Sequence, residues 1–312
     1  MRVLVAGASG VVGKALVPAL LARGHTVAGI VRKSASAEFL ARLGATPIVA
    51  DALDRPAMMA CVADFGPEIV THQLTALPAT TDLRKFARLF EQTNRLRTEG
   101  LDNLMNAARA SGVRRFVSQS FCGWPYARDG GLVKTENDPL DPDPPPAFRS
   151  TLAALRHVEE ITLESAPIHG IALRYGGFYG SGTFISRDGA MVEQVRRRRF
   201  PIVGTGGGIW SFLHVDDLAS ASVAAIEGDA TGIFNVVDDD PAALNTWLPG
   251  LARALNAAPP RRIPAILGRL VLPRHLFLMM TEMRGGSNVK FKRVFGWQPK
   301  YRSWRDGFEG GL

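Results

Sequence analysis

The chain has 312 residues, 46% of them hydrophobic, and a formal net charge of +8 at pH 7. This length suffices for one large domain or for a domain with an added lobe. The sequence has no run of about 18 apolar residues, which excludes a membrane-spanning helix and leaves no reason to expect a membrane partner. Cys61 and Cys122 are too few and too scattered for a disulfide framework or a zinc site. We therefore expect a reducing, cytoplasmic location and no metal site.

The excess positive charge is concentrated at residues 196–199, with a smaller pair at Arg261 and Arg262. A solvated basic face is the simplest interpretation of these clusters. No recognition module or set of stacking aromatic residues accompanies them, so nucleic acid is not expected as a partner. An anionic cofactor or a small-molecule anionic substrate accounts for the charge more economically.

The first residues predict a nucleotide-binding turn. Residues 2–6 are a short apolar run rich in valine, which is typical of a buried strand. Glycines then recur with the spacing G-x-x-G-x-x-G, and a helical pattern covers residues 11–23. Such a turn presents bare backbone N–H groups at a helix N-terminus, which suits a pyrophosphate. The sequence thus predicts a dinucleotide site at Gly7, Ser9, Gly10, Val11, Val12 and Gly13.

Strand patterns continue at residues 26–31, 46–50, 68–72, 115–119 and 170–173. They alternate with helical patterns at 35–43, 55–63, 84–111 and 147–165, which predicts a parallel sheet covered on both faces. After residue 174 the alternation ends, and two further strands at 211–215 and 232–237 flank a helix at 216–227. We predict an α/β fold with a Rossmann-type doubly wound parallel sheet in residues 1–175 plus 212–236. Residues 176–211 plus 237–312 would form a smaller C-terminal substrate lobe, with ligands bound between the two.

The end of the second strand bears on the choice of dinucleotide. An acidic residue there would bind the ribose 2′-hydroxyl of NAD, whereas a cation can hold a 2′-phosphate. Arg32, with Lys33 and Ser9, therefore favours NADP(H), with NAD(H) the less favoured cofactor. The two cations could equally be solvated charges at the start of a helix. Asp51, followed by Ala52, is placed to bind the adenine amino group, or else to cap a helix.

Motifs along nearly the whole chain resemble those of the extended short-chain dehydrogenase/reductases, the group of sugar-nucleotide epimerases and dehydratases. The segments that carry the resemblance are GASGVVG, PEIVTHQLTAL, TNRLRTEGLDNLMNAARASGVRRFVSQS, LRYGGFYGSGT, FLHVDDLASA and NVKFKRVFGWQPKY. The resemblance implies an NAD(P)-binding Rossmann fold and a homodimer built from helices 84–111 and 147–165. It also implies that Leu74, Thr75, Ala76, Asn94, Ser118, Thr151 and Tyr175 lie near the cofactor.

The chain departs from this family at its catalytic unit. Family members carry Tyr-x-x-x-Lys on the helix after the fifth strand, and the aligned positions here are Ala147 and Thr151. The hydroxyl position that precedes this helix aligns with Phe121 and Cys122. A free tyrosine has a pKa near ~10 and is a poor base at pH 7 without a nearby cation. The usual proton relay therefore cannot be carried over.

Residues that could replace the missing catalytic groups lie at the end of the fifth strand and after it. Ser120 could orient the substrate oxygen, and Tyr126 could donate a proton if Arg128 or Lys134 lowered its pKa. Tyr126 could instead only pack the pocket wall. Three functions stay open: an NADP(H)-dependent oxidoreductase acting on a small or medium carbonyl or alcohol, a sugar-nucleotide epimerase or dehydratase, and a non-catalytic NADP(H) sensor.

Overall fold

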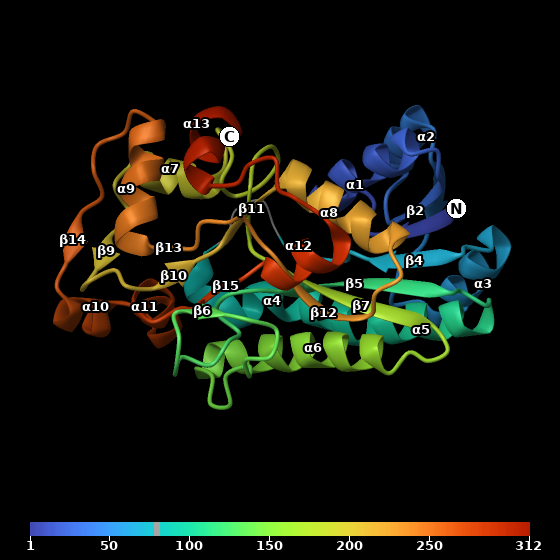
Figure 1. Ribbon diagram of the computed structural model, residues 1–312, viewed down its shortest axis with the longest axis horizontal. Helices are drawn as coiled ribbons and strands as arrows, with labels where there is room; N and C mark the ends of the chain where they lie inside the picture. Colours follow the sequence, from blue (N-terminus) through green and yellow to red (C-terminus); the bar gives the residue numbers. More distant parts are fainter. Residues whose placement is uncertain (78–81) are drawn as a thin grey trace.

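A seven-stranded parallel sheet forms the centre of the molecule (Figure 1). The computed structural model describes residues 1–77 and 82–312. The strand order is β12-β7-β5-β4-β1-β2-β3, and every neighbouring pair is parallel. The strands are β1 (Arg2–Ala6), β2 (Thr26–Val31), β3 (Thr46–Val49), β4 (Ile69–His72), β5 (Arg115–Phe121), β7 (His169–Tyr175) and β12 (Gly232–Val236). This arrangement confirms the predicted Rossmann-type fold.

The middle of the sheet is apolar because helices cover both of its faces. In β1, Val3 pairs with Val27 of β2 on one side and with Ile69 of β4 on the other, and all three are fully or almost fully buried. The strand order reverses at β1, so the connection after β1 leads to α1 (Val11–Ala22) on one face of the sheet and the connection after β4 leads to α4 (Phe86–Arg95) on the other. In doubly wound sheets the ligand crevice forms at this switch point.

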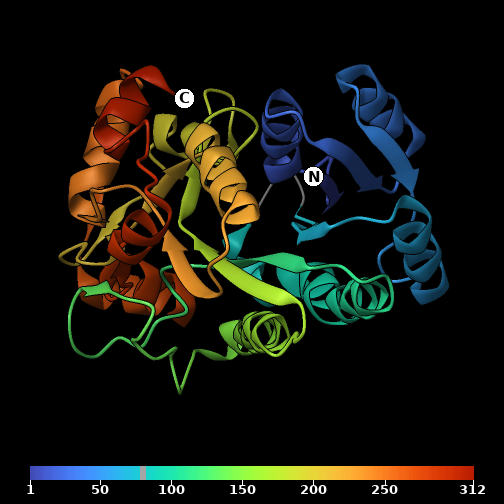
Figure 2. The same cartoon turned by 45° about the vertical axis from the view of Figure 1, so that its right-hand side comes forward.

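The helices lie in two layers, one on each face of the sheet (Figures 1 and 2). One layer contains α1 (Val11–Ala22), α2 (Ser34–Leu43) and α8 (Val215–Glu227). The other contains α3 (Arg55–Phe65), α4 (Phe86–Arg95), α5 (Leu101–Ala110) and α6 (Pro146–Leu163). Each layer has its own buried apolar cluster against the sheet.

The predicted helix 84–111 is not one continuous α-helix. It begins with a 3₁₀ turn, η1 (Leu83–Lys85), continues as α4, passes through a π-helical turn, η2 (Leu96–Gly100), and ends as α5. The predicted strand 211–215 is also shorter, because only β11 (Phe212–His214) is extended. It pairs with β8 (Gly177–Tyr179) outside the main sheet.

A third apolar cluster forms the core of the smaller lobe, with Trp247, Phe212 and Trp304 among its buried members. The lobe and its connections contain β6 (Val133–Lys134), α7 (Ala190–Arg196), β9 (Ile202–Val203), β10 (Ile209–Trp210), β13 (Ala242–Ala243), α9 (Leu244–Ala254), β14 (Arg262–Ile263), α10 (Ala265–Val271), α11 (Arg274–Thr281), β15 (Gly285–Gly286) and α13 (Trp304–Gly310). The helix α12 (Val289–Phe295) packs instead on the sheet, where Phe291 and Trp297 join the cluster around α1 and α8. Among the described helices, none is long and apolar enough to cross a membrane.

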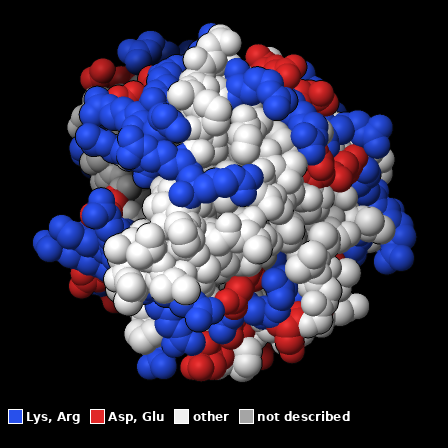
Figure 3. All heavy atoms as spheres, turned by 90° about the vertical axis from the view of Figure 1, so that its left-hand side faces the viewer, with Lys and Arg blue, Asp and Glu red and all other residues white. Residues whose placement is uncertain are grey.

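The lobe side of the molecule displays a dense group of Lys and Arg side chains (Figure 3). The two basic clusters noted in the sequence meet there, because Arg198 donates a hydrogen bond to the carbonyl oxygen of Pro259, close to Arg261 and Arg262. All four arginines of residues 196–199 are exposed, as in a solvated basic face.

Gly170 offers a test of how closely α6 packs on the sheet. A Cβ at this position of β7 would overlap the carbonyl oxygen of Thr162. Gly170→Ala should lower the free energy of unfolding by about 1–3 kcal/mol, because the backbone must shift to admit the methyl group. Urea denaturation measures the loss. Gly131→Ala, at an exposed glycine with room for a Cβ, is the control. Equal losses in the two variants would contradict this packing.

Candidate active site

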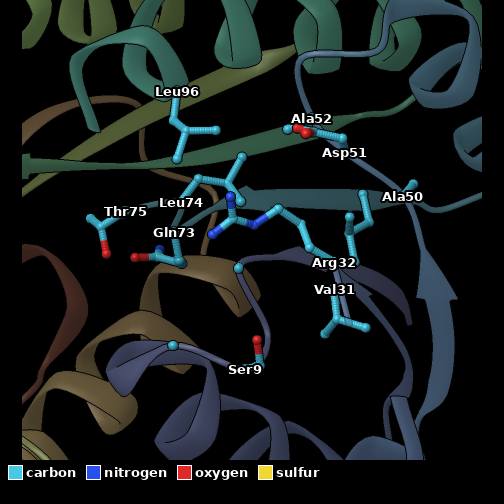
Figure 4. Close-up of a pocket in the computed structure, with 13 residues that line it drawn as sticks. Ser9, Val31, Arg32, Ala50, Asp51, Ala52, Gln73, Leu74, Thr75 and Leu96 are labelled. Carbon is cyan, nitrogen blue, oxygen red and sulfur yellow. The ribbon is translucent and has the colours of Figure 1, made fainter. Parts of the chain in front are cut away.

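A pocket opens at the carboxyl ends of β1, β2, β3 and β4 (Figure 4). The structure brings eight of the predicted cofactor residues into its wall: Gly7, Ser9, Gly10, Arg32, Asp51, Ala52, Leu74 and Thr75. Five lining residues were not predicted, namely Ile30, Val31, Ala50, Gln73 and Leu96. Most of these are apolar strand ends, which carry no chemical signal in a sequence. Leu96 comes from η2 and enters only because the π-helical turn reaches this edge.

The glycine turn is shaped by close backbone contacts. Gly7 has φ +91°, and a Cβ there would lie 2.6 Å from the carbonyl oxygen of Gln73. A Cβ at Gly13 would overlap the carbonyl oxygen of Gly7, so α1 approaches β1 as closely as two backbones can. Gly10 is the N-cap of α1 and provides no side-chain cap. The N–H groups of the first helical residues, Val11 and Val12, therefore point toward the turn, which fits a pyrophosphate.

The pocket also contains one cation and one carboxylate. The side chain of Arg32 leaves the end of β2 and extends over the pocket (Figure 4). Asp51 lines the wall after β3, and its Oδ1 accepts a hydrogen bond of 3.0 Å from the N–H of Leu53. Lys33 is the exposed N-cap residue of α2 and does not line the pocket. A ligand phosphate near Ser9 would thus meet the guanidinium of Arg32.

Besides Lys33, the predicted cofactor residues outside the pocket wall are Val11, Val12, Gly13, Ala76, Asn94, Ser118, Thr151 and Tyr175. Asn94 on α4 donates from Nδ2 to Oγ1 of Thr151 on α6, 3.1 Å away. Ser118 accepts a hydrogen bond from a threonine of α6, and its hydroxyl faces the helix layer. The Tyr175 hydroxyl bonds to Ser222 in the opposite layer, where burial raises its pKa to about 12.

The predicted catalytic residues Ser120 and Tyr126 belong to one buried polar network. Arg174 donates two hydrogen bonds, of 2.7 and 2.6 Å, to the carboxylate of Glu159. Ser120 donates to the same carboxylate at 2.7 Å. The Tyr126 hydroxyl donates to Oδ1 of Asn235 at 2.6 Å and accepts from Arg174 at 3.0 Å. All five side chains are buried.

The hydrogen bonds of this network engage the hydroxyl groups of Ser120 and Tyr126, which a proton transfer to the substrate would need. Burial raises the pKa of Tyr126 far above its usual range, although the nearby Arg174 acts in the opposite direction. Lys134 does not contact Tyr126; its Nζ donates to the carbonyl oxygen of Asp129 at 2.6 Å and contacts Asp138 at 3.4 Å. Ser120, Tyr126 and Lys134 do not line the pocket described above. Arg128 pairs with Asp141, so among the described residues the cation hydrogen-bonded to Tyr126 is Arg174 and neither Arg128 nor Lys134.

An aromatic cluster lies where the resemblance would place the Tyr-Lys pair. Phe148 follows Ala147 on α6, and its ring lies 4.3 Å from that of Trp124, in the loop after β5. Phe86 of α4 lies 4.7 Å from Phe148 and 4.3 Å from Phe90, measured between ring centroids. We call Phe86, Phe90, Trp124 and Phe148 the aromatic cluster. Three separate segments contribute to it, so no local pattern in the sequence could have revealed it.

Comparison with known proteins places the chain among nucleotide-dependent enzymes. Residues 3–236 match the model of the NAD dependent epimerase/dehydratase family. A Streptomyces protein named 3-diazoavenalumate denitrifying reductase is 45% identical over 308 residues, covering 98% of this chain and 99% of the relative. UDP-glucose 4-epimerase of Mycolicibacterium smegmatis is 28% identical, covering 96% of this chain and 94% of the relative. The structure of UDP-glucose 4-epimerase from Thermus thermophilus in complex with NAD superposes over 100% of both chains, with a TM-score of 0.72 and 25% identity.

The variant Tyr126→Phe tests whether Tyr126 stabilises the fold or donates a proton in catalysis. The variant removes the hydroxyl that bridges Arg174 and Asn235, so the free energy of unfolding should fall by about 1–3 kcal/mol. The value of kcat should fall far less than the roughly 10²–10⁴-fold that loss of a general acid causes. Urea denaturation and steady-state kinetics measure the two effects, with Tyr301→Phe, at a partly exposed tyrosine, as control. A loss of kcat at unchanged stability would restore Tyr126 as proton donor.

Proposed function

Because the chain belongs to the NAD-dependent epimerase/dehydratase family, we propose that it is an NADPH-dependent reductase whose substrate accepts hydride without a proton from the enzyme. We further propose that the substrate is an aromatic acid carrying a diazo group. The observation that carries this proposal is the replacement of the family's Tyr-Lys pair by Ala147 and Thr151, beside the aromatic cluster.

The residues of the pocket suit the cofactor. The glycine turn at the N-terminus of α1 would hold the pyrophosphate, and Asp51 would accept a hydrogen bond from the adenine amino group. Arg32 and Ser9 would hold a 2′-phosphate, which favours NADPH over NADH. The nicotinamide, when bound, supplies hydride.

The chemistry of the acceptor explains why a proton relay is dispensable. Reduction of a carbonyl leaves an alkoxide, which must be protonated, and no described residue presents an ionisable hydroxyl of low pKa to the pocket. Reduction of an arenediazonium differs, because one hydride replaces dinitrogen: the C–N bond breaks, a C–H bond forms, and N₂ leaves with no net uptake of a proton. The enzyme then has to bind and orient the substrate and exclude water.

Two further observations support a diazo arene. The 45% identical relative is named for reductive denitrification of a diazo compound. Phe90 is the partly exposed member of the aromatic cluster, and its apolar, polarisable ring packs well against a planar aryl group, while the buried Phe86 stacks on it. An epimerase or dehydratase must first oxidise a hydroxyl, which requires a base that is deprotonated at neutral pH, and burial keeps Tyr126 protonated by raising its pKa. A carbonyl or alcohol oxidoreductase stays as the second candidate because the relatives include a ketoreductase.

Arg32→Ala tests the choice of cofactor. A hydrogen bond to a charged group contributes about 1.5–3 kcal/mol, so the dissociation constant for NADPH should rise about tenfold or more. Affinity for NADH should change little. Fluorescence titration of both cofactors measures the ratio, and Arg42→Ala, at the far end of α2, is the control. An equal loss of affinity for NADH and NADPH would contradict a role in binding the 2′-phosphate.

The substrate class is tested by supplying NADPH with 4-carboxybenzenediazonium, with a panel of ketones and aldehydes, and with UDP-glucose. We expect NADPH oxidation together with formation of benzoate and N₂, above the rate without enzyme. Because Tyr126, whose pKa burial raises, transfers no proton in the proposed reaction, kcat should have no alkaline limb near the ordinary pKa of tyrosine, about 10. Turnover of a carbonyl but not of the diazonium would favour the second candidate. Formation of UDP-galactose would establish an epimerase.

A further inference from the structure

Arg97 is a buried cation without a partner. Its side chain lies in η2 and is only 5% exposed, and its Nη1 has no hydrogen-bond partner. Among residues 1–77 and 82–312, no carboxylate lies within salt-bridge distance of it. Burial lowers its pKa to about 10, and no acidic group opposes that shift. The guanidinium is therefore still charged at neutral pH, but it has lost its hydration without gaining an anion.

The other buried arginines, Arg115 and Arg174, both have hydrogen-bond partners that compensate their charge. Arg174 forms its ion pair with Glu159. Arg115 donates hydrogen bonds of 2.7 Å to the carbonyl oxygens of Ala225 and Ala230. A buried charge without such compensation is costly to the folded state, so its presence requires an explanation. A ligand that brings the missing anion provides one.

The position of Arg97 points to the same conclusion. The preceding residue, Leu96, lines the cofactor pocket, and its carbonyl oxygen bonds to Nε2 of His72 at the end of β4, 3.0 Å away. The guanidinium carbon of Arg97 lies 5.9 Å from the ring centroid of Phe90, a member of the aromatic cluster. Arg97 thus stands between the cofactor pocket and the aromatic cluster. Single π-helical turns of the kind that holds it occur frequently at functional sites.

The neighbouring ionisable groups do not neutralise the positive charge of Arg97 and add no further net positive charge beside it. His72 is neutral, because burial lowers its pKa to about 4 and the charge of Arg97 acts in the same direction. The neighbouring cation on the helix, Arg95, faces outward and is neutralised by Glu99 through hydrogen bonds of 3.0 and 2.8 Å. An anion entering this region from the pocket would therefore meet an uncompensated positive charge beside aromatic rings.

We propose that Arg97 binds the carboxylate of the aromatic substrate, whose ring packs against Phe90, the partly exposed member of the aromatic cluster. This assignment rests on the proposed function for the identity of the substrate, and it deepens that function by naming the group that orients it. A planar guanidinium can donate two parallel hydrogen bonds to a carboxylate and so fixes its direction. The gain is large here because binding also relieves the unpaired charge.

The experiment measures binding, with no turnover. Protein saturated with NADP⁺ is titrated calorimetrically with cinnamate and with cinnamamide, which differ in the charge of one group. We expect the wild-type protein to bind cinnamate at least about tenfold more tightly, as a charge-assisted hydrogen bond implies. Arg97→Met should reduce this preference to about one, and Arg97→Lys should keep part of it. Arg95→Met, two residues away and exposed, should leave the preference as in the wild type.

The thermal stability of the ligand-free protein distinguishes a ligand-binding Arg97 from one that only supports the fold. Removing an uncompensated buried charge should raise the Tm of the ligand-free protein by about 2 °C, whereas loss of a structural contact lowers it. A lower Tm in Arg97→Met with an unchanged preference for cinnamate would overturn the proposal. Weaker binding of NADP⁺ with an unchanged preference would also overturn it, because the anion would then be a cofactor phosphate.

The outcome is independent of the diazo assay. If Arg97 governs the preference for cinnamate but no diazo compound is reduced, the proposed function fails and the carboxylate site stands. If diazo compounds are reduced but cinnamate and cinnamamide bind equally to the wild-type protein, the carboxylate site fails and the proposed function stands.

Discussion

The ion pair between Glu159 and Arg174 joins α6 to β7 near the carboxyl ends of the strands. Ser120 at the end of β5 and Tyr126 in the following loop attach to the same pair, and Asn235 of β12 completes the network. Three neighbouring strands and one helix are thereby fixed to one another through buried hydrogen bonds. Removing one charge would leave the other buried and unpaired, which costs about 3–5 kcal/mol in comparable sites.

The same pair determines what chemistry remains available. It draws the hydroxyls of Ser120 and Tyr126 into the protein interior, away from the pocket wall. The apolar side chains Phe148 and Trp124 fill the neighbouring space. Ala147 and Thr151, at the positions of the family's Tyr-Lys pair, carry no phenol or ammonium group, and Thr151 is hydrogen-bonded to Asn94. A substrate that needs no proton is compatible with these side chains.

The fold was predictable because its signals are local. Alternating apolar runs defined the strands, and the glycine spacing located the turn whose backbone contacts at Gly7 and Gly13 the structure displays. Three residues of the pocket wall were predicted from local positions as well: Ser9 from the glycine turn, Arg32 from the end of the second strand and Asp51 from the end of the third. The neighbourhood of the predicted catalytic residues was not predictable, because it depends on partners far along the chain. Tyr126 meets Asn235, and nothing near residue 126 in the sequence indicates that the hydroxyl is buried.

The π-helical turn at residues 96–100 has a consequence for how this region arose. Each residue of an α-helix advances the chain by about 100° around the axis. One additional residue in a helix therefore rotates every earlier side chain relative to every later one by that angle. In η2 this offset sets the direction of the buried Arg97 relative to Leu101 and Leu104 of α5, which belong to the apolar cluster on the sheet. The buried charge beside the cofactor pocket thus depends on the count of residues in one turn, and a single insertion or deletion is enough to create or abolish it.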